Sequence, residues 1–417
     1  MRTTLRTIVG CLAVGALVAG CGAGGPRSAG GKLSDDKLVL AVLNDQSGVY
    51  SALSGQNSVL AVNLAIEDFK AKYGDKAVTQ NIEVITADHQ NKPDVASTKA
   101  TEMYDRSGAD IILDVPTSSA ALAVADIAKQ KKRLYFNIGA ATTDLTGKSC
   151  NKYTFHYAYD TWMLAHGTGT TVTKNGAKNW YIIYPNYAFG QDMNKNFTEA
   201  ITAAGGAVVA ADGTPFPNQS GDYSTQLLKA TTFDAKPITL GAMQAGADLV
   251  NVVKQYNEFK LKDKGIGLAV GLMFLTDIHS LTPDALAGTT FTDAWYWNFD
   301  ERNRAWADKF AARAGGQRPT FAHAANYSAA TQYLEAVQAA GTDDADTIVK
   351  ALEGKSVNDI FLRNGKIRAE DHRVVHDVYL AQVKPSTEVK EPWDYEKILK
   401  TIPAADAFRA PSADCKL

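Results

Sequence analysis

The sequence has no excess of basic residues and few cysteines. Its 417 residues include 43 Lys and Arg against 45 Asp and Glu, which gives a formal net charge of −2. Without a basic surplus or a clustered Lys/Arg stripe, counterion release does not drive binding to a phosphate backbone. We therefore expect no nucleic-acid partner. The chain is 45% hydrophobic and 21% charged, which is typical of a globular protein long enough for two domains.

Motifs of catalysis and metal binding are also missing. The sequence contains no G-x-S-x-G elbow, no G-x-x-x-x-G-K-[ST] phosphate loop and no H-E-x-x-H. His372 and His376 in HRVVH have the spacing of two metal ligands on one helix face. Their flanks alternate as in a strand, however, which favours exposed edge residues over a metal site. We expect neither enzyme activity nor a cofactor nor a metal.

The first 37 residues have the pattern of an export signal followed by a tether. Arg2 and Arg6 precede an apolar run that is too short to span a bilayer, and Val-Ala-Gly-Cys then ends at Cys21. This tetrad resembles a bacterial lipobox, in which cleavage before the cysteine leaves a residue that carries lipid. The alternative is an ordinary signal peptide with Cys21 as a bystander. The prediction is a lipoprotein signal peptide over 1–20, a flexible tether over 21–37, and anchoring to the outer face of the cell membrane.

The other cysteines fit an exported protein. Cys11 leaves with the signal peptide, so Cys150 and Cys415 are the two that remain in the body of the protein. Two thiols in an oxidising compartment suggest one disulfide, which would tie the C-terminal tail to a loop near residue 150. The alternative is a pair of free thiols.

Strand patterns alternate with helical patterns through most of the chain. After the first apolar run, Val59, Val62, Ile66 and Phe69 recur at spacings of three and four, which indicates one face of a helix. Such alternation indicates parallel sheets covered by helices on both faces. The expected strands are LVLAVL (38–43), IEVIT (82–86), ADIILDV (109–115) and RLYFNI (133–138), then NWYIIY (179–184), VVAAD (208–212), PITLGA (237–242) and GLAVGLMF (267–274).

These elements form two sets, which suggests two lobes. The pattern changes near residues 157, 295 and 356, where we expect the chain to cross between the lobes. The expected limits are 38–157 plus 296–355 for the first lobe, and 158–295 plus 356–417 for the second lobe and the tail. The aromatic cluster at 295–297 lies at one such crossing, and core or hinge packing is favoured over ligand contact.

Loops at the carboxyl ends of the expected strands carry candidate ligand contacts, because ligands gather at that edge of an open parallel sheet. In the first set, NDQSGVYSALSG supplies the ring of Tyr50. PTSSA supplies Thr117 and Ser118, which can cap a helix and hold an anion together with its N–H groups. GAATTDLTG is expected to offer an exposed carbonyl at Ala140 and the hydroxyl of Thr142.

The second set offers a matching group of loops. Tyr187 and Phe189 are candidates for one wall of a ligand site, Gln244 for an amide contact, and Asp277 for a partner of a cation or hydroxyl. Taken alone, each of these loops is also explained by capping or by ordinary loop chemistry.

Several phrases, spread over the chain from about residue 37 to its end, are informative together. They are DQSGVYSALSGQNSVLAVNLAIEDF, ADHQNKPD, FNIGAATTDLTG, HYAYDTWMLAHGTG, NYAFG, KEPWDY and TIPAADAF. In this order they resemble the leucine/isoleucine/valine-binding (branched-chain amino-acid-binding) family of solute-binding proteins of ABC transporters. The resemblance implies an α/β type I periplasmic-binding-protein fold. In that fold two doubly wound parallel-sheet lobes, joined by a three-crossover hinge, close on a ligand.

The resemblance also implies roles for the loop residues. The serine-rich turn and the Ala-x-Thr turn that hold the ligand's carboxylate, and its amino group where present, match Thr117, Ser118, Ala140 and Thr142. The aromatic of the first loop matches Tyr50, that of the second lobe matches Phe189, and the second-lobe acid matches Asp277 approximately. Cys150 and a cysteine near the C-terminus also look like features of one branch of the family.

Two departures from the family leave the amino-acid pocket incomplete. Asp277 stands where amino-acid binders usually have glutamate, and Gln244 stands where the leucine/isoleucine/valine binders have an aromatic contact. We therefore expect a small organic ligand: a carboxylate such as an amino acid, aromatic acid or keto acid, or an amide.

The sequence thus predicts a lipid-anchored, monomeric solute-binding protein. It hands its small-molecule ligand to ABC permease subunits driven by separate ATPase subunits. One alternative is a sensory lipoprotein with the same clamp. Another is an exported hydrolase that uses Asp277 and His279 as acid and base.

Overall fold

The structure is a computed structural model that describes residues 33–417. The expected signal peptide, the lipidation of Cys21 and the tether up to residue 32 lie outside the described residues. Within residues 33–417, no helix has both the length and the apolar character needed to cross a membrane.

The first lobe is built on a five-stranded parallel sheet in the order β2-β1-β3-β4-β5. Every residue of β1 is buried, because helices cover both faces of the sheet. Val39 and Leu43 join a core with α2 and α3, whereas Leu40 and Val42 join the core that includes α1 and α11. The elements are β1 (Leu38–Asn44), α1 (Gly55–Tyr73), β2 (Ile82–Asp88), α2 (Pro93–Asp105), β3 (Ile111–Asp114), α3 (Ser118–Lys131), β4 (Leu134–Asn137), β5 (Thr154–His156), α10 (Glu301–Ala311), α11 (Phe321–Ala340) and α12 (Ala345–Leu352).

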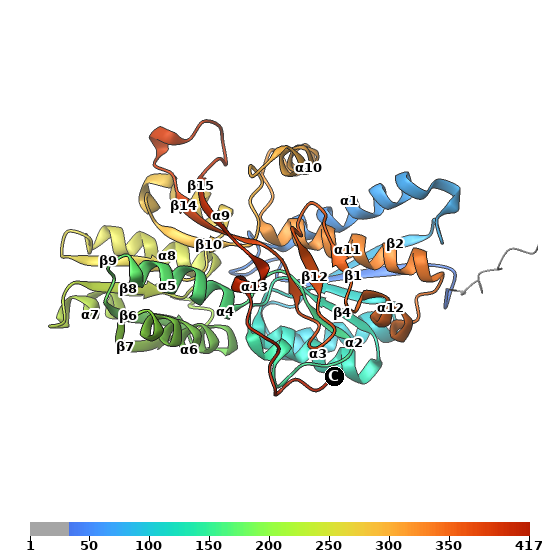
Figure 1. Ribbon diagram of the computed structural model, residues 1–417, viewed down its shortest axis with the longest axis horizontal. Helices are drawn as coiled ribbons and strands as arrows, with labels where there is room; N and C mark the ends of the chain where they lie inside the picture. Colours follow the sequence, from blue (N-terminus) through green and yellow to red (C-terminus); the bar gives the residue numbers. More distant parts are fainter. Residues whose placement is uncertain (1–32) are drawn as a thin grey trace, which may run out of the picture.

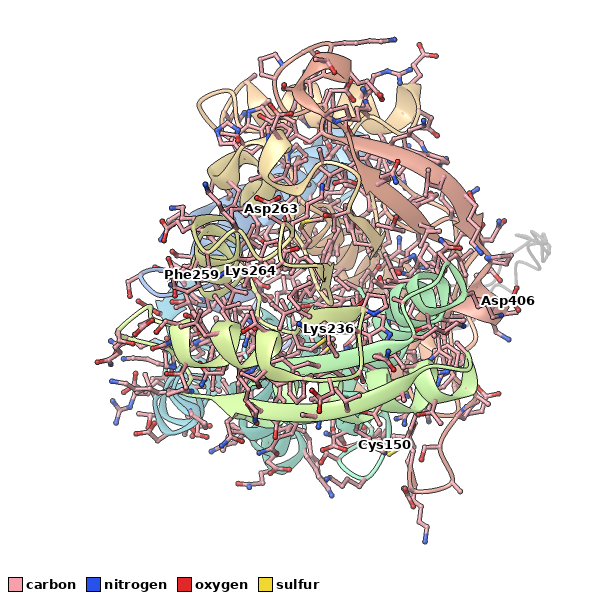
Figure 2. All side chains as sticks on the ribbon, turned by 90° about the vertical axis from the view of Figure 1, so that its left-hand side faces the viewer. Cys150, Lys236, Phe259, Asp263, Lys264 and Asp406 are labelled. Carbon is pink, nitrogen blue, oxygen red and sulfur yellow. A yellow bond between two sulfur atoms is a disulfide. The ribbon has the colours of Figure 1, made fainter. Side chains whose placement is uncertain are left out.

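The second lobe has a four-stranded parallel sheet in the order β7-β6-β8-β9. Figure 2 looks at its outer end, where Lys236 and Lys264 mark the chain just before β8 and β9. The carboxyl ends of these strands point away from that end, toward the first lobe. The elements are α4 (Thr161–Leu164), α5 (Thr170–Lys174), β6 (Asn179–Pro185), α6 (Ala188–Ala203), β7 (Ala207–Thr214), α7 (Ser224–Lys229), β8 (Ile238–Ala242), α8 (Gly246–Glu258), β9 (Ile266–Val270) and α9 (Leu275–Leu281).

A three-stranded antiparallel sheet, β10-β14-β15, lies where the lobes join (Figure 1). A second small sheet, β11-β12-β13, reaches β5 through a bridge between His156 and Arg373. The expected fold class, two doubly wound lobes joined by three crossovers, is confirmed, while the exact lobe limits stay a prediction. The remaining elements are β10 (Thr290–Asp293), β11 (Ser356–Val357), β12 (Gly365–Ile367), β13 (Val374–Val375), β14 (Val378–Val383), β15 (Glu396–Ile402) and α13 (Ala404–Ala407).

The aromatic cluster at 295–297 packs at this junction. Trp295, Tyr296 and Trp297 are all buried. The indole N–H of Trp295 donates to the carbonyl of Ile360 at 2.7 Å, and that of Trp297 donates to the carbonyl of Trp393 at 2.8 Å. The cluster therefore joins the chain after β10 to the later segments around residues 360 and 393.

The structure corrects the expectation that His372 and His376 are exposed. His372 and His376 are buried rather than exposed, because the His372 ring stacks on Phe155 at 4.2 Å and Nε2 of His376 lies 2.8 Å from the carbonyl oxygen of Ala158. Residues 161–174 do not form one regular helix, because a π-helical turn over 165–169 separates α4 from α5. Gly167 lies in that turn, and a Cβ there would come within 2.1 Å of a β10 side chain.

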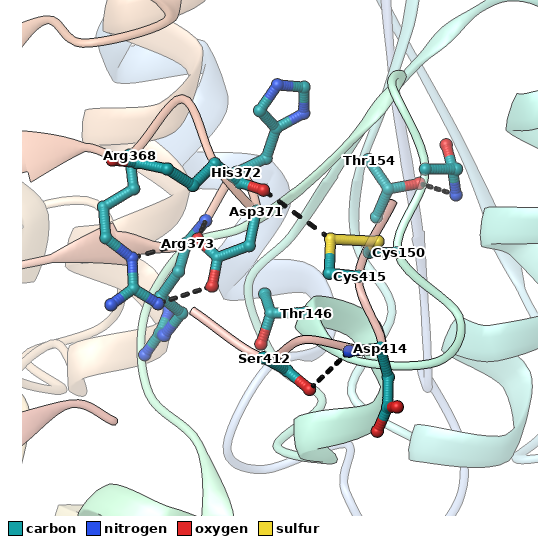
Figure 3. Close-up of a disulfide and its surroundings, with 12 residues drawn as sticks. Thr146, Cys150, Thr154, Arg368, Asp371, His372, Arg373, Ser412, Asp414 and Cys415 are labelled. Atoms are coloured by element: carbon teal, nitrogen blue, oxygen red, sulfur yellow. Dashed lines mark hydrogen bonds and ion pairs between the residues drawn. A yellow bond between two sulfur atoms is a disulfide. The ribbon is translucent and has the colours of Figure 1, made fainter. Parts of the chain in front are cut away.

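Cys150 and Cys415 form a disulfide with a Cα–Cα distance of 5.4 Å (Figure 3). The bond fixes the C-terminal tail to the loop between β4 and β5. The tail is also held by Arg373, whose guanidinium lies 4.2 Å from the ring centre of Phe408.

Candidate functional site

A small pocket lies between the two parallel sheets, at the carboxyl ends of their strands. None of its lining side chains carries a charge. The lining residues are Tyr50, Leu53, Pro116, Gly139, Tyr159, Tyr187, Phe189, Ala245, Leu272 and Phe274. An apolar hollow of this kind at a switch between strands and helices is the expected place for a small ligand.

The loop that carries Tyr50 is shaped by Asp45. The Asp45 carboxylate accepts hydrogen bonds from the backbone N–H of Gly48 at 2.7 Å and of Tyr50 at 2.8 Å. A Cβ on Gly48 would lie 2.8 Å from that carboxylate, so a larger residue there would displace the Asp45 side chain. Together these contacts place the Tyr50 ring in the cavity wall.

Asn91, from the loop between β2 and α2, joins two parts of the site. Its amide nitrogen donates to Asp45 at 2.6 Å, and its amide oxygen accepts from the Thr117 hydroxyl. Asn91 is buried, which makes these bonds costly to lose. The residue therefore fixes the Tyr50 loop relative to the start of α3.

The start of α3 meets the cavity through Pro116. Thr117 and Ser118 are buried beside it but do not line the cavity. The Ser118 hydroxyl accepts a bond from the backbone N–H of Thr142 at 3.3 Å. Asp114 and Val115 have positive φ angles of 81° and 56°, a backbone arrangement that is costly for such residues and that recurs at ligand sites.

The loop after β4 forms the neighbouring part of the wall. A Cβ on Gly139 would lie 2.6 Å from the Cα of Pro116, so only glycine lets the two loops approach this closely. The carbonyl of Ala140, expected to be exposed, instead accepts from the Asn137 amide at 2.7 Å and lies 2.9 Å from Nε2 of His156. Burial holds the pKa of His156 well below its usual value, so its ring is neutral.

Aromatic side chains of the second lobe close the opposite side. The Tyr187 ring stacks on Phe216 at 3.9 Å, and Phe189 follows it in the first turn of α6. The hydroxyl oxygens of Tyr50 and Tyr187 lie 2.7 Å apart, so the two lobes touch across the cavity. Burial raises the pKa of both phenols, which keeps both hydroxyls protonated.

Gln244 and Asp277 are buried but do not line the cavity. The Asp277 carboxylate accepts from the backbone N–H of Phe274 at 3.0 Å and so caps α9, and burial raises its pKa to about 7. The amide nitrogen of Gln244 lies 3.3 Å from the Thr214 hydroxyl, and its amide oxygen has no partner. A direct ligand contact for either residue stays a prediction.

The acid and base considered for a hydrolase do not meet. Nδ1 of His279 lies 2.8 Å from the Tyr395 hydroxyl, and its ring stacks on Trp393 at 3.8 Å. Asp277 is engaged with the start of α9. Within the described residues, moreover, no group of three or more His, Cys, Asp or Glu is placed to hold a metal ion.

Three of the nine expected ligand contacts, Tyr50, Tyr187 and Phe189, line the cavity. Thr142 lies beside the wall, where its hydroxyl accepts from the N–H of Asp144 at 3.3 Å. Pro116 and Gly139 each precede an expected residue by one position. Tyr159 and Phe274 were missed, although the phrase HYAYDT and the end of the β9 pattern marked their positions.

The lobes are in contact beyond the cavity as well. The backbone N–H of Ala247, at the start of α8, donates to the carbonyl of Val49 at 3.0 Å. Gly246 has φ +57°, and a Cβ there would lie 2.3 Å from that same carbonyl oxygen. The structure thus represents a closed arrangement of the lobes, and it depends on glycine at this position.

Comparison with known proteins agrees with this geometry over most of the chain. A family model described as "Periplasmic binding protein" matches residues 37–388. The crystal structure of a periplasmic binding protein from Burkholderia mallei superposes with a TM-score of 0.84. The two chains are 40% identical, and the match covers 90% of this chain and 96% of the other.

Two further solved structures extend the comparison. A branched-chain amino acid ABC transporter periplasmic ligand-binding protein from Burkholderia xenovorans LB400 is 35% identical over 91% of this chain and 100% of its own, with a TM-score of 0.78. A solute-binding protein of an ABC transporter from Rhodopseudomonas palustris BisB5, in complex with 3,4-dihydroxybenzoic acid, shares the fold. Its TM-score is 0.75 at 23% identity, with 89% and 98% of the two chains covered.

Proposed function

This chain belongs to the periplasmic binding protein family, and on that basis we propose that it serves an ABC importer as a lipid-anchored, extracytoplasmic solute-binding protein. It captures a small carboxylated molecule by closing its two lobes, and it delivers that ligand to a permease driven by separate ATPase subunits. The observation that carries this proposal is the cavity between the lobes, across which Tyr50 and Tyr187 meet.

The lining favours a flat aromatic or keto acid over an α-amino acid. Nine of the ten lining residues present rings or aliphatic side chains, and an aromatic ring that buries about 150 Å² gains roughly 4 kcal/mol. An ammonium group, in contrast, needs an acid within reach. Asp277 does not line the cavity, and it already caps α9 and is partly protonated at neutral pH.

A carboxylate has two kinds of donor close to the cavity. The first backbone N–H groups of α3, next to Pro116, have no acceptor within the helix and suit an anion. One of the two hydroxyl protons of Tyr50 and Tyr187 forms the hydrogen bond between these residues. The other hydroxyl proton is free to point to the ligand. Lobe closure then buries the remaining ligand surface, so the ligand favours the closed state by contacts that the open state lacks.

The proposal is tested by direct binding. Purified residues 33–417 are titrated with benzoate, 4-hydroxybenzoate, phenylpyruvate, leucine and leucinamide, followed by calorimetry and by the melting temperature. An aromatic or keto acid at a hundred times its dissociation constant should stabilise the fold by about 2.7 kcal/mol. Leucine binding more tightly than every acid would reject the ligand class. Solute capture itself would be rejected if a broad metabolite panel gave no shift.

Lipid attachment has its own test. In cells fed a labelled fatty acid, the full-length chain should take up the label, and Cys21→Ser should abolish the uptake. Export without label would favour an ordinary signal peptide.

A further inference from the structure

Asp192 makes a second connection between the lobes, at a place outside the cavity. It lies on α6 of the second lobe. Its Oδ2 accepts from the backbone N–H of Thr143 at 2.7 Å and from the Thr143 hydroxyl at 2.9 Å. Thr143 belongs to the first lobe, in the loop after β4 that also carries the cavity residue Gly139.

The carboxylate is held in place from its own lobe. The Thr161 hydroxyl donates to Oδ2 at 2.5 Å, and the Asn196 amide donates to Oδ1 at 3.0 Å. These bonds within the second lobe fix the orientation of the Asp192 side chain independently of Thr143. Burial raises the pKa of Asp192, and the hydrogen bonds from Thr161 and Thr143 act against that rise. When the carboxylate is ionised, its hydrogen bonds are stronger than those of a neutral acceptor.

The Thr143 side of this contact is fixed by the tail. Nη2 of Arg409 donates to the carbonyl of Thr143 at 2.6 Å. The backbone carbonyl of Arg409 in turn accepts from Arg368 at 2.6 Å, and the disulfide of Cys415 holds the end of the tail (Figure 3). Thr143 is thus bound by the tail on one side and by Asp192 on the other.

We propose that Asp192 is a positioning residue that latches the two lobes in the closed state through Thr143. The inference rests on the proposed function, because a latch matters only if the lobes open and close. None of the hydrogen bonds of Asp192 described above reaches a residue that lines the cavity. Asp192 therefore acts on ligand affinity by setting the fraction of molecules in the closed state.

The competing explanation is that Asp192 only stabilises α6 through Thr161 and Asn196. Two variants separate these roles. Asp192→Asn removes the charge from every one of these bonds. Thr143→Val removes the hydroxyl on the first-lobe side and leaves the contacts of Asp192 within its own lobe in place. Glu199→Gln, on an exposed position of the same helix, is the matched control for charge.

The first measurement needs no ligand. Hydrogen exchange of the segment 139–150 is followed by mass spectrometry in the ligand-free, disulfide-bonded protein. A spin-label distance across the cleft is measured in parallel. Asp192→Asn and Thr143→Val should each speed exchange of that segment at least tenfold and shift the distance toward open values, whereas Glu199→Gln changes neither. Unchanged exchange and distance in both variants would overturn the latch.

The second measurement uses benzoate as the probe. Both latch variants should bind it at least tenfold more weakly than the parent, with melting temperatures of the ligand-free proteins close to that of Glu199→Gln. Equal benzoate affinity in parent and variants would reject the latch. If benzoate binds to none of them, the proposed ligand class fails, and the exchange and distance measurements still decide the role of Asp192.

Discussion

The hydroxyl oxygens of Tyr50 and Tyr187 lie 2.7 Å apart although the two residues follow strands of different sheets. Each ring belongs to the wall of its own lobe, and the bond forms only when the lobes meet. The pair therefore couples ligand enclosure to closure, and its two parts, ring and hydroxyl, are separable by substitution.

Tyr50→Phe and Tyr50→Ala separate the contribution of the Tyr50 hydroxyl from that of its ring. Phe keeps the ring and loses a hydrogen bond of about 1 kcal/mol, so ligand affinity should fall roughly fivefold. Ala removes the wall as well and should lower affinity at least a hundredfold, while the lobe stays folded because Asp45 binds the backbone of the loop. Calorimetric titration measures both effects. Tyr73→Phe, which loses a tyrosine hydroxyl bond to Glu335 far from the cavity, is the control; equal affinities for all the variants would remove Tyr50 from the site.

Gly246→Ala tests closure. A Cβ would lie 2.3 Å from the Val49 carbonyl oxygen, so the variant should bind ligand at least tenfold more weakly and adopt a more open form in solution scattering. Gly265→Ala is the matched control, since Gly265 has φ +76° with open space around it. Both variants should lose about 1 kcal/mol of stability from backbone strain. A closed, tightly binding Gly246→Ala would contradict the contact.

Asp277 predicts a specific pH dependence of stability. Burial raises its pKa to about 7 in the folded state, whereas an unfolded aspartate titrates near about 3.9. Between these values the folded state binds one proton more, so this group's contribution to the free energy of unfolding falls as the pH rises from 4 to 7 and then levels off.

Asp277→Asn removes that contribution. The parent should lose up to about 4 kcal/mol of unfolding free energy relative to the variant as the pH rises across this range. Urea titrations at a series of pH values measure it. A difference that stays constant with pH would show that Asp277 is ionised when buried.

Loss of the disulfide should destabilise the protein. The bridge joins residues 265 positions apart, and the chain-entropy model assigns about 5 kcal/mol to such a loop, with observed losses of 2–5 kcal/mol. Cys150→Ser with Cys415→Ser should therefore lower the melting temperature by several degrees. The parent protein should show the same loss after reduction, and a double variant as stable as the parent would show that the other contacts of the tail suffice.

The sequence was sufficient for the fold, because its signals were local. Apolar runs such as 38–43 and helical spacing such as Val62 to Ile66 are set within single elements, and the structure places β1 and α1 there. The His372 and His376 expectation failed for the opposite reason. Alternation around the two histidines indicated a strand with one exposed face. That face is covered by residues far away in the sequence, such as Phe155, on which His372 stacks.

The site was predictable only in part for a related reason. Tyr50, Tyr187 and Phe189 were found because they follow strand ends, which all face the cavity. The carbonyl of Ala140 was misjudged because its partners, Asn137 and His156, meet only through the register of β4 and β5. No sequence pattern marked Asp192, because its proposed role depends on a hydrogen bond from Thr143 in the other lobe.

Asn91 touches both the loop of Tyr50 and the start of α3 without lining the cavity. This arrangement limits which residues can be varied when the protein is engineered into a fluorescent biosensor for a new metabolite. Leu53 and Leu272 can be varied in a mutant library to reshape the pocket, whereas Asn91 must stay, because a change there disturbs two walls at once and confuses altered selectivity with a damaged scaffold.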